Sequence, residues 1–157
     1  KCSDKDIINK IESIINEKRI LEKSIKNINS YNQIELVEDL VESSESIGEN
    51  RIIVKQIDNL SDLNVLGDLF RQKFRGPGIA LIGTIISQKP MILCSVTDDL
   101  CDKIKAGNIV KIVGKVLGGG GGGKPHMATA GGKDCSKLEN ALNIGKKNII
   151  EVLDNNG

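Results

Sequence analysis

The feature that most constrains this chain is a run of six glycines, Gly118–Gly123, which is followed by the sequence KPHMATAGG up to Gly132. Glycine loses more conformational entropy on folding than any other residue and has no side chain to pack. Such a run is therefore either a flexible linker or an ordered loop whose backbone N–H groups come close to another group. Because a segment with helical apolar spacing precedes the run and a small-residue segment follows it, we predict an ordered glycine-rich loop over residues 118–132.

The N-terminal residues 4–30 are predicted to form one long helix. Their apolar residues are spaced alternately by four and three, which is a heptad pattern, and Lys18 is the one polar residue in the series. The resulting seam consists of Ile7, Ile11, Ile14, Leu21, Ile25 and Ile28. Two interpretations stay open. The helix forms a coiled coil with a second copy or with a preceding helix of a longer protein, or it docks on its own domain.

Helices and strands alternate in the rest of the chain. After a break at residues 31–33, a shorter helix starts at Ile34 and fades over residues 43–50. Further helices are expected after an N-cap at Ser61, from Asp98, from Ala106 to Val116, and from a capping box at residues 136–139. The predicted strands, of which the middle two form a hairpin, are residues 51–57, 79–86, 91–97 and 127–130.

This order of elements predicts an α/β (α+β) fold in which a small mixed sheet packs with helices behind a long, coiled-coil-like N-terminal helix. We expect a helical stalk over residues 1–33 and a globular domain over residues 34–157. Because the chain begins at Lys1 rather than Met, we expect a fragment of a longer protein. No apolar stretch approaches the roughly 18 residues of a membrane-spanning helix, so we expect an intracellular protein without a membrane partner.

Catalytic and metal-binding motifs find little support in the sequence. The glycine run and Lys124 match G-x-x-x-x-G-K, but Pro125 replaces the Ser or Thr that binds Mg²⁺, and a helix rather than a strand precedes the run. The four cysteines lack metal-ligand spacing, and His126 is the only histidine. We therefore predict no catalytic residue, no metal site and no cofactor in this chain.

Anion binding is the chemistry that remains. Consecutive glycines can present several N–H groups to a phosphate, and Lys124 adds a positive charge beside them. Residues 1–50 hold seven Lys or Arg against eleven Asp or Glu, whereas residues 51–157 hold fifteen against ten. This basic excess permits contact with nucleic acid. The alternative stays open that the glycines only allow close packing of helix and sheet, and that the lysines form a solvated surface.

The segment that starts at Lys105-Ala106-Gly107 resembles the C-terminal DHH-associated domain of alanyl-tRNA synthetase. The pattern of that domain is a helix entered through Ala-Gly, a glycine-rich loop, a basic residue and Pro, and then Met-Ala-x-Ala-Gly-Gly. Residues 124–132, KPHMATAGG, fill this pattern closely. The resemblance covers roughly residues 34–153 well and residues 1–33 by architecture only.

The resemblance implies a non-catalytic module that binds tRNA(Ala) through its globular part and forms a homodimer through its helical part. It implies a cytoplasmic parent enzyme that uses ATP, Mg²⁺ and Zn²⁺ in other domains to attach alanine to tRNA(Ala). Since the chain has only two Phe, one Tyr and no Trp, base stacking is expected to contribute little. The expected RNA contacts are Lys124, the backbone of Gly121, Gly122 and Gly123, and the side chains of Lys111, Lys115, Lys133 and His126, with Arg71, Lys73 and Arg75 as a second basic cluster.

Two other functions are compatible with this resemblance. The chain is a dimerisation or protein-interaction module with little affinity for tRNA, or it is the accessory domain of a DHH-type phosphoesterase. In those phosphoesterases a His follows the glycine loop directly, whereas here Lys124 follows it and His126 comes two residues later. The sequence also lacks an Asp-His-His motif, which disfavours the phosphoesterase and leaves the role of His126 open between loop structure and RNA contact.

Overall fold

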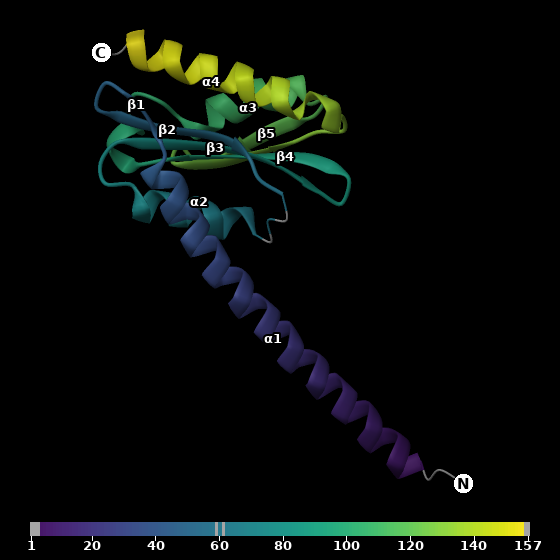
Figure 1. Cartoon of the computed structure of the whole chain (residues 1–157). Coiled ribbons are helices and arrows are strands. Elements are labelled where there is room, and N and C mark those ends of the chain that lie inside the picture. Colours follow the sequence, from purple (N-terminus) through teal and green to yellow (C-terminus); the bar gives the residue numbers. More distant parts are fainter. Residues whose placement is uncertain (1–3, 59, 61, 156–157) are drawn as a thin grey trace. The chain divides into compact units, whose positions relative to one another are not determined.

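The computed structural model describes residues 4–58, 60 and 62–155, and the chain divides into two units, Lys1–Leu36 and Val37–Gly157. Helix α1, Asp4–Glu42, makes up the described part of the first unit and continues into the second (Figure 1). The predicted break at residues 31–33 is wrong. The helix continues because residues 4–42 contain no Gly or Pro, the two residues that interrupt a helix most strongly.

The apolar seam of α1 is exposed where its side chains are described. Ile11, Ile14 and Leu21 are 51%, 54% and 58% exposed, respectively. The side chains of Ile7, Ile25 and Ile28 lie outside the described part of the chain. The expected coiled coil of this helix, with a second copy or with another helix, stays a prediction.

The second unit is built on one six-stranded mixed sheet with the strand order β1-β2-β3-β4-β6-β5. β2 and β3 pair in parallel, and every other neighbouring pair is antiparallel. The predicted strands and hairpin are confirmed, and two strands were not predicted, β1 and β5. The strands are β1 (Glu45–Ile47), β2 (Asn50–Gln56), β3 (Gly78–Ile86), β4 (Lys89–Val96), β5 (Gly120–Gly123) and β6 (Met127–Gly131).

Helices cover the two faces of the sheet. α2 (Leu63–Lys73) lies on one face, while α3 (Ala106–Val116) and α4 (Leu138–Asn155) lie on the other (Figure 1). The core between the sheet and α3 and α4 includes Ile79, Leu81 and Cys94, which are fully buried. It is built from Ile, Leu, Val and Ala side chains because the chain has so few aromatic residues.

Turns and caps differ from the predictions in three places. Asp62 caps α2 by accepting hydrogen bonds from the N–H groups of Asn64 and Val65, and Ser61 lies outside the described residues. The segment at Asp98 is a single 3-10 turn, Asp98–Leu100. The capping box at residues 136–139 is wrong, because Asp134 caps a 3-10 turn, Cys135–Lys137, and α4 begins only at Leu138. Ser136 does not act as the cap, because both its N–H and its hydroxyl donate to the Asp134 carboxylate, at 3.1 Å and 2.6 Å.

Candidate nucleic-acid interface

The glycine run is a strand and not a loop, which corrects the prediction for residues 118–132. Gly120–Gly123 form β5 at one edge of the sheet, where β5 pairs with β6 in the register Gly120↔Gly131 to Gly123↔Ala128. An extended strand alternates the direction of its N–H groups. The glycines therefore do not direct several N–H groups towards one phosphate, as the predicted loop would. They form an exposed edge strand instead.

α3 packs directly on β5 because Gly121 of the strand and Gly114 of the helix leave room for this contact. A Cβ on Gly121 would lie 2.6 Å from the Val110 carbonyl oxygen, and one on Gly123 would lie 2.6 Å from the Cα of Ala128. From the helix side, a Cβ on Gly114 would lie 2.8 Å from the carbonyl carbon of Gly120. Close packing of α3 therefore explains the glycine at position 121, whereas Gly123 is explained by its contact with Ala128 of β6 and by its φ of 153°.

The remaining strand glycines face open space. A Cβ on Gly120 or Gly122 would meet no atom within 4 Å. Because side chains of a strand alternate between faces, these two positions lie on the face of β5 that is turned away from α3. Packing inside the chain does not require glycine at either position. The exposed backbone of these two residues is therefore accessible to another molecule.

The KPHM sequence forms the turn between β5 and β6. The Lys124 N–H donates to the Met127 carbonyl at 2.8 Å, and the Met127 N–H donates back to Lys124 at 3.3 Å. The turn is fixed on two sides, because the Pro125 carbonyl accepts from the Ala106 N–H and the His126 carbonyl accepts from the Val96 N–H, both at 2.8 Å. His126 is half-buried at the tip and Lys124 is exposed beside the glycine strand.

The predicted lysines lie in a row rather than in one cluster. The turn at Lys124 adjoins the first residue of α3, whereas the Lys133 N–H donates to the Leu117 carbonyl just past the other end of that helix. An α-helix of 11 residues is about 16 Å long, so Lys124 and Lys133 are separated by about that length. Lys111 and Lys115 are exposed on α3 between these ends. Because α3 covers one face of β5, these two lysines and the bare face of Gly120 and Gly122 lie on opposite sides of the strand.

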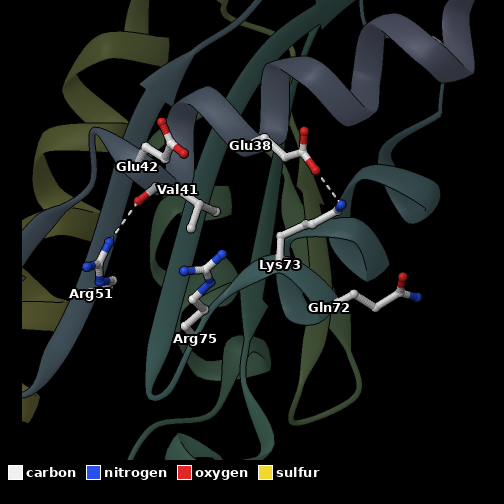
Figure 2. A pocket seen from close by; sticks show the side chains of 7 residues that line it. All are labelled: Glu38, Val41, Glu42, Arg51, Gln72, Lys73 and Arg75. Carbon is white, nitrogen blue, oxygen red and sulfur yellow. Dashed lines mark hydrogen bonds and ion pairs between the residues drawn. The ribbon is translucent and has the colours of Figure 1, made fainter.

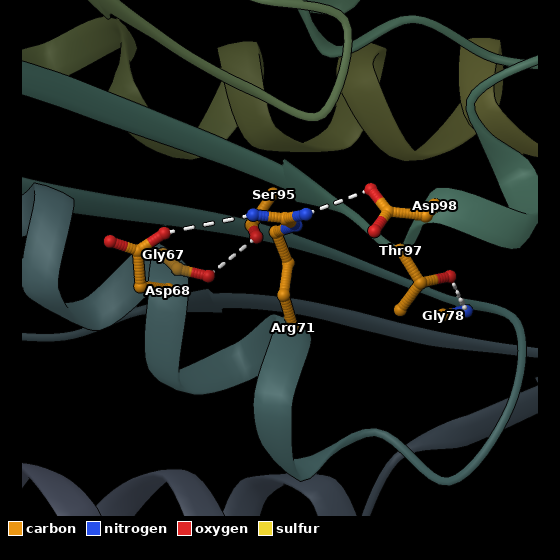
Figure 3. A network of polar contacts seen from close by, with 7 residues as sticks. All are labelled: Gly67, Asp68, Arg71, Gly78, Ser95, Thr97 and Asp98. Carbon is orange, nitrogen blue, oxygen red and sulfur yellow. Dashed lines mark hydrogen bonds and ion pairs between the residues drawn. The ribbon is translucent and has the colours of Figure 1, made fainter.

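The second basic cluster is mostly committed to ion pairs within the fold. Lys73 pairs with Glu38 (Figure 2). Arg71 donates to the Asp98 carboxylate at 2.8 Å and lies 3.7 Å from the Asp68 carboxylate (Figure 3). Among the described residues, Arg75 has neither a hydrogen bond nor an ion pair. Only one of the three predicted cations is thus free to bind an external anion.

Hydrogen bonds around Arg71 hold α2 on the sheet. The Ser95 hydroxyl donates to the Gly67 carbonyl at 2.7 Å, and the Gly78 N–H donates to the Thr97 Oγ1 at 2.9 Å (Figure 3). Asp98 lies next to Thr97 and accepts from Arg71. Arg71 was predicted as a weaker candidate for RNA contact, and in the structure its guanidinium is held in ion pairs between α2 and the end of β4.

Thiol and metal chemistry are weak in the described part of the chain. Burial, with a smaller effect of Cys101, raises the pKa of the Cys94 thiol well above its ordinary value, and burial also raises the pKa of Cys101, with Asp98 adding to it. Both thiols are therefore protonated near neutral pH and are poor nucleophiles. Within residues 4–58, 60 and 62–155, no group of three His, Cys, Asp or Glu residues is placed to hold a metal ion. No described helix is long and apolar enough to cross a bilayer.

Comparison with known proteins gives consistent matches. Residues 49–151 match the family model of the DHHA1 domain. The alanine–tRNA ligase of Dehalococcoides mccartyi is 37% identical over 140 residues, covering 87% of this chain and 16% of that protein. The alanine–tRNA ligase of Acetivibrio thermocellus is 34% identical over 157 residues, covering 98% of this chain and 17% of that protein. The chain thus spans about a sixth of the length of these relatives.

A solved structure matches the fold as well. The C-Ala domain from Aquifex aeolicus alanyl-tRNA synthetase is similar with a TM-score of 0.59 and 28% sequence identity. The match covers 71% of this chain and 97% of that domain. The similarity therefore extends over nearly the whole of the compared domain.

Proposed function

Because the chain belongs to the DHHA1 domain family, we propose that it is a non-catalytic C-terminal region of an alanine–tRNA ligase, which binds tRNA(Ala) and forms a homodimer. Attachment of alanine to tRNA is assigned to other parts of such an enzyme. We assign RNA binding to the globular domain of residues 34–157 and self-association to the helical residues 1–33. The proposed role requires no metal or nucleotide cofactor within this chain.

The observation that carries the RNA-binding proposal is the bare face of Gly120 and Gly122 next to Lys124. Both glycines lie on an edge strand, have open space in front of them, and are not required there by internal packing. A strand without side chains lets a ribose-phosphate backbone come close to the main chain, as glycines do at other phosphate sites. Lys124 then supplies a charge beside that strand, so recognition depends on charge and RNA shape.

The other predicted contacts lie around β5, with Lys111 and Lys115 on the side opposite to the bare glycine face. Lys111, Lys115 and Lys133 lie along and beyond α3, so they suit phosphates that are spread along an RNA backbone rather than a single anion. His126 presents an imidazole at the turn tip, where a donor or acceptor can reach a sugar or a base. Binding through several separate phosphate contacts predicts a strong dependence on salt concentration.

Titration of the chain with a fluorescently labelled tRNA(Ala) transcript, followed by anisotropy at about 50 mM and about 200 mM salt, tests the RNA proposal. We expect Lys124→Ala to weaken binding and to lower the slope of log affinity against log salt by about 1. Gly122→Val is expected to weaken binding by filling the bare face, without harm to an exposed strand position. Lys147→Ala, at an exposed lysine of α4, is the matched control. No binding at the lower salt concentration, or equal loss in the control, contradicts the proposal.

The observation that favours self-association is the exposed seam of α1. Ile11, Ile14 and Leu21 share one heptad face and are each more than half exposed in the single chain. An apolar stripe of this length gains free energy when a second helix covers it. A second copy of the same chain provides a matching stripe, and the resulting coiled coil joins two RNA-binding domains.

Sedimentation equilibrium of the chain tests this second proposal. We expect a mass of twice 17.0 kDa for the wild type and a monomer for the double variant Ile14→Ser/Leu21→Ser. Ile20→Ser is the control, since Ile20 is 59% exposed on the same helix and lies outside the seam. A wild-type chain that sediments as a monomer at high micromolar concentration rejects the homodimer.

A further inference from the structure

A polar pocket of about 620 Å³ opens in the second unit, on the face of the sheet that carries α2 (Figure 2). Its walls are the last turn of α1, the start of β2 and the C-terminal end of α2, which place Glu42, Arg51, Lys73 and Arg75 around one space. β2 lies near the edge of the sheet opposite to β5. The pocket is therefore separate from the glycine strand and from its turn.

Two of the cations in this pocket are held by the protein itself. The Arg51 Nη1 donates to the Val41 carbonyl at 3.1 Å and to the Ser44 hydroxyl at 3.3 Å. Lys73 is paired with Glu38. These contacts fix the walls of the pocket and neutralise one of its two carboxylates.

The two remaining charges have no partner within the described residues. Arg75 is exposed and its guanidinium is directed towards the wall formed by α1 (Figure 2), and Glu42 lies in that wall. Neither side chain has a hydrogen bond or an ion pair among the described residues. The pocket is thus lined by the Arg75 guanidinium, which only donates hydrogen bonds, and by the Glu42 carboxylate, which only accepts them.

We propose that this pocket binds a ribonucleotide, with the phosphate on Arg75 and the sugar hydroxyls on Glu42. A guanidinium recognises a phosphate through two parallel hydrogen bonds, and a carboxylate is the acceptor that proteins use for ribose hydroxyls. A phosphate alone would only place a second anion in the pocket with Glu42, whereas a ribose supplies hydrogen-bond donors to this carboxylate. The volume lies within the range of small-ligand pockets, which is about 300–1,000 Å³.

This inference does not depend on the glycine strand. The site favours ribose over deoxyribose, because the 2′-hydroxyl of a ribose donates a hydrogen bond to the charged Glu42 carboxylate that deoxyribose cannot donate. The three cations and two carboxylates that line the pocket give it a net charge of +1. This charge suits the phosphate of one nucleotide rather than the many phosphates of a long RNA backbone.

The test is a titration of the ¹⁵N-labelled chain, followed by ¹H–¹⁵N NMR, with adenosine 5′-monophosphate, its 2′-deoxy counterpart and inorganic phosphate as separate probes. We expect the ribonucleotide to shift the amide signals of residues 38–42 and 72–75, with affinity roughly tenfold above that of the deoxy compound. Arg75→Gln is expected to lower affinity for both nucleotides, and Glu42→Gln to remove the preference for ribose. Lys55→Gln, at an exposed lysine of β2, is the control and leaves binding unchanged.

Three results overturn the proposal. They are shifts confined to signals outside the pocket, equal binding of phosphate and nucleotide, and wild-type affinity in Arg75→Gln. Each variant changes an exposed side chain without a partner, and an unchanged NMR spectrum away from the pocket verifies its fold. Lys124→Ala serves to separate the two proposals, because it alters tRNA binding at the glycine strand and leaves mononucleotide binding in the pocket intact.

Discussion

Gly121 of β5 faces the backbone of Val110 in α3 so closely that a Cβ on Gly121 would lie 2.6 Å from the Val110 carbonyl oxygen. A backbone oxygen in a helix cannot move aside as a flexible side chain can, because it is part of the hydrogen-bonded helix. The contact between α3 and β5 therefore requires glycine at position 121. It does not require glycine at the neighbouring position 122.

The two adjacent positions give a matched pair of variants. Gly121→Ala is expected to lower the free energy of unfolding by about 1–3 kcal/mol, because the new methyl group forces α3 and β5 apart. Gly122→Ala, with open space around its Cβ, is expected to leave stability unchanged or slightly higher. Urea denaturation followed by circular dichroism measures both. Equal destabilisation by the two variants contradicts the packing explanation.

Thr97 and Asp98 make contacts of different strength at the end of β4. The Thr97 hydroxyl accepts from the buried Gly78 N–H, so Thr97→Val leaves that donor unpaired and is expected to cost about 1–3 kcal/mol. Asp98 pairs with Arg71 but its side chain is 80% exposed, so Asp98→Asn is expected to cost less than about 1 kcal/mol. Chemical denaturation of both variants gives the ranking, and a larger loss for Asp98→Asn runs against it.

The hairpin between β3 and β4 turns through two non-glycine residues with positive φ angles, Ser87 at 50° and Gln88 at 61°. A two-residue turn with both φ values positive is of type I′, which favours glycine at its second position. We expect Gln88→Gly to raise stability by about 0.5–1 kcal/mol, since the left-handed conformation costs a side-chain residue more than glycine. Lys89→Gly, one residue later in the strand, is expected to lower stability by about 0.5–1 kcal/mol. Thermal unfolding of both variants shows whether the effect of glycine on stability differs between the turn at residue 88 and the strand at residue 89.

The structure alters the titration of the Asp134 carboxyl group. Hydrogen bonds from the Ser136 side chain and then from Lys137 lower the pKa of Asp134 below its ordinary value. Because the folded pKa lies below the unfolded one, the cap stabilises the fold at pH values above the unfolded pKa. This stabilisation is lost as the pH falls through the folded pKa. NMR titration of the carboxyl carbon should show the low pKa, and Ser136→Ala should raise it. An unchanged pKa in that variant would show that Ser136 is not the cause.

Much of the second unit was predictable because its signals are local. Two strand-forming segments separated by residues 87–90 predicted β3 and β4 as a hairpin. The spacing of Ile109 and Val113 predicted α3, which is confirmed with Lys111 and Lys115 on the exposed side. The resemblance to the C-terminal domain of alanyl-tRNA synthetase is also confirmed, because it rested on a long motif rather than on composition.

Most errors concern segments whose state depends on distant partners. The exception is the break expected at residues 31–33, which does not exist because this stretch contains neither Gly nor Pro and α1 continues through it. The short strand β1 was missed because three residues carry no period, and only its pairing with β2 defines it. The ion pairs of Arg71 with Asp98 and of Lys73 with Glu38 could not be predicted either, since these partners lie 27 and 35 residues away along the chain.

The sequence by itself determined that a six-glycine run leads into KPHMATAGG, that helical and strand-forming segments surround it, and which family the pattern resembles. Tertiary structure decided what the run is. Glycine has no side chain and therefore no apolar period, so only hydrogen bonds to β6 and the contact of Val110 and Gly114 with β5 make it a strand. The same packing divides the glycines of β5 into Gly121, which α3 requires, Gly123, which β6 requires, and the two that face open space, Gly120 and Gly122.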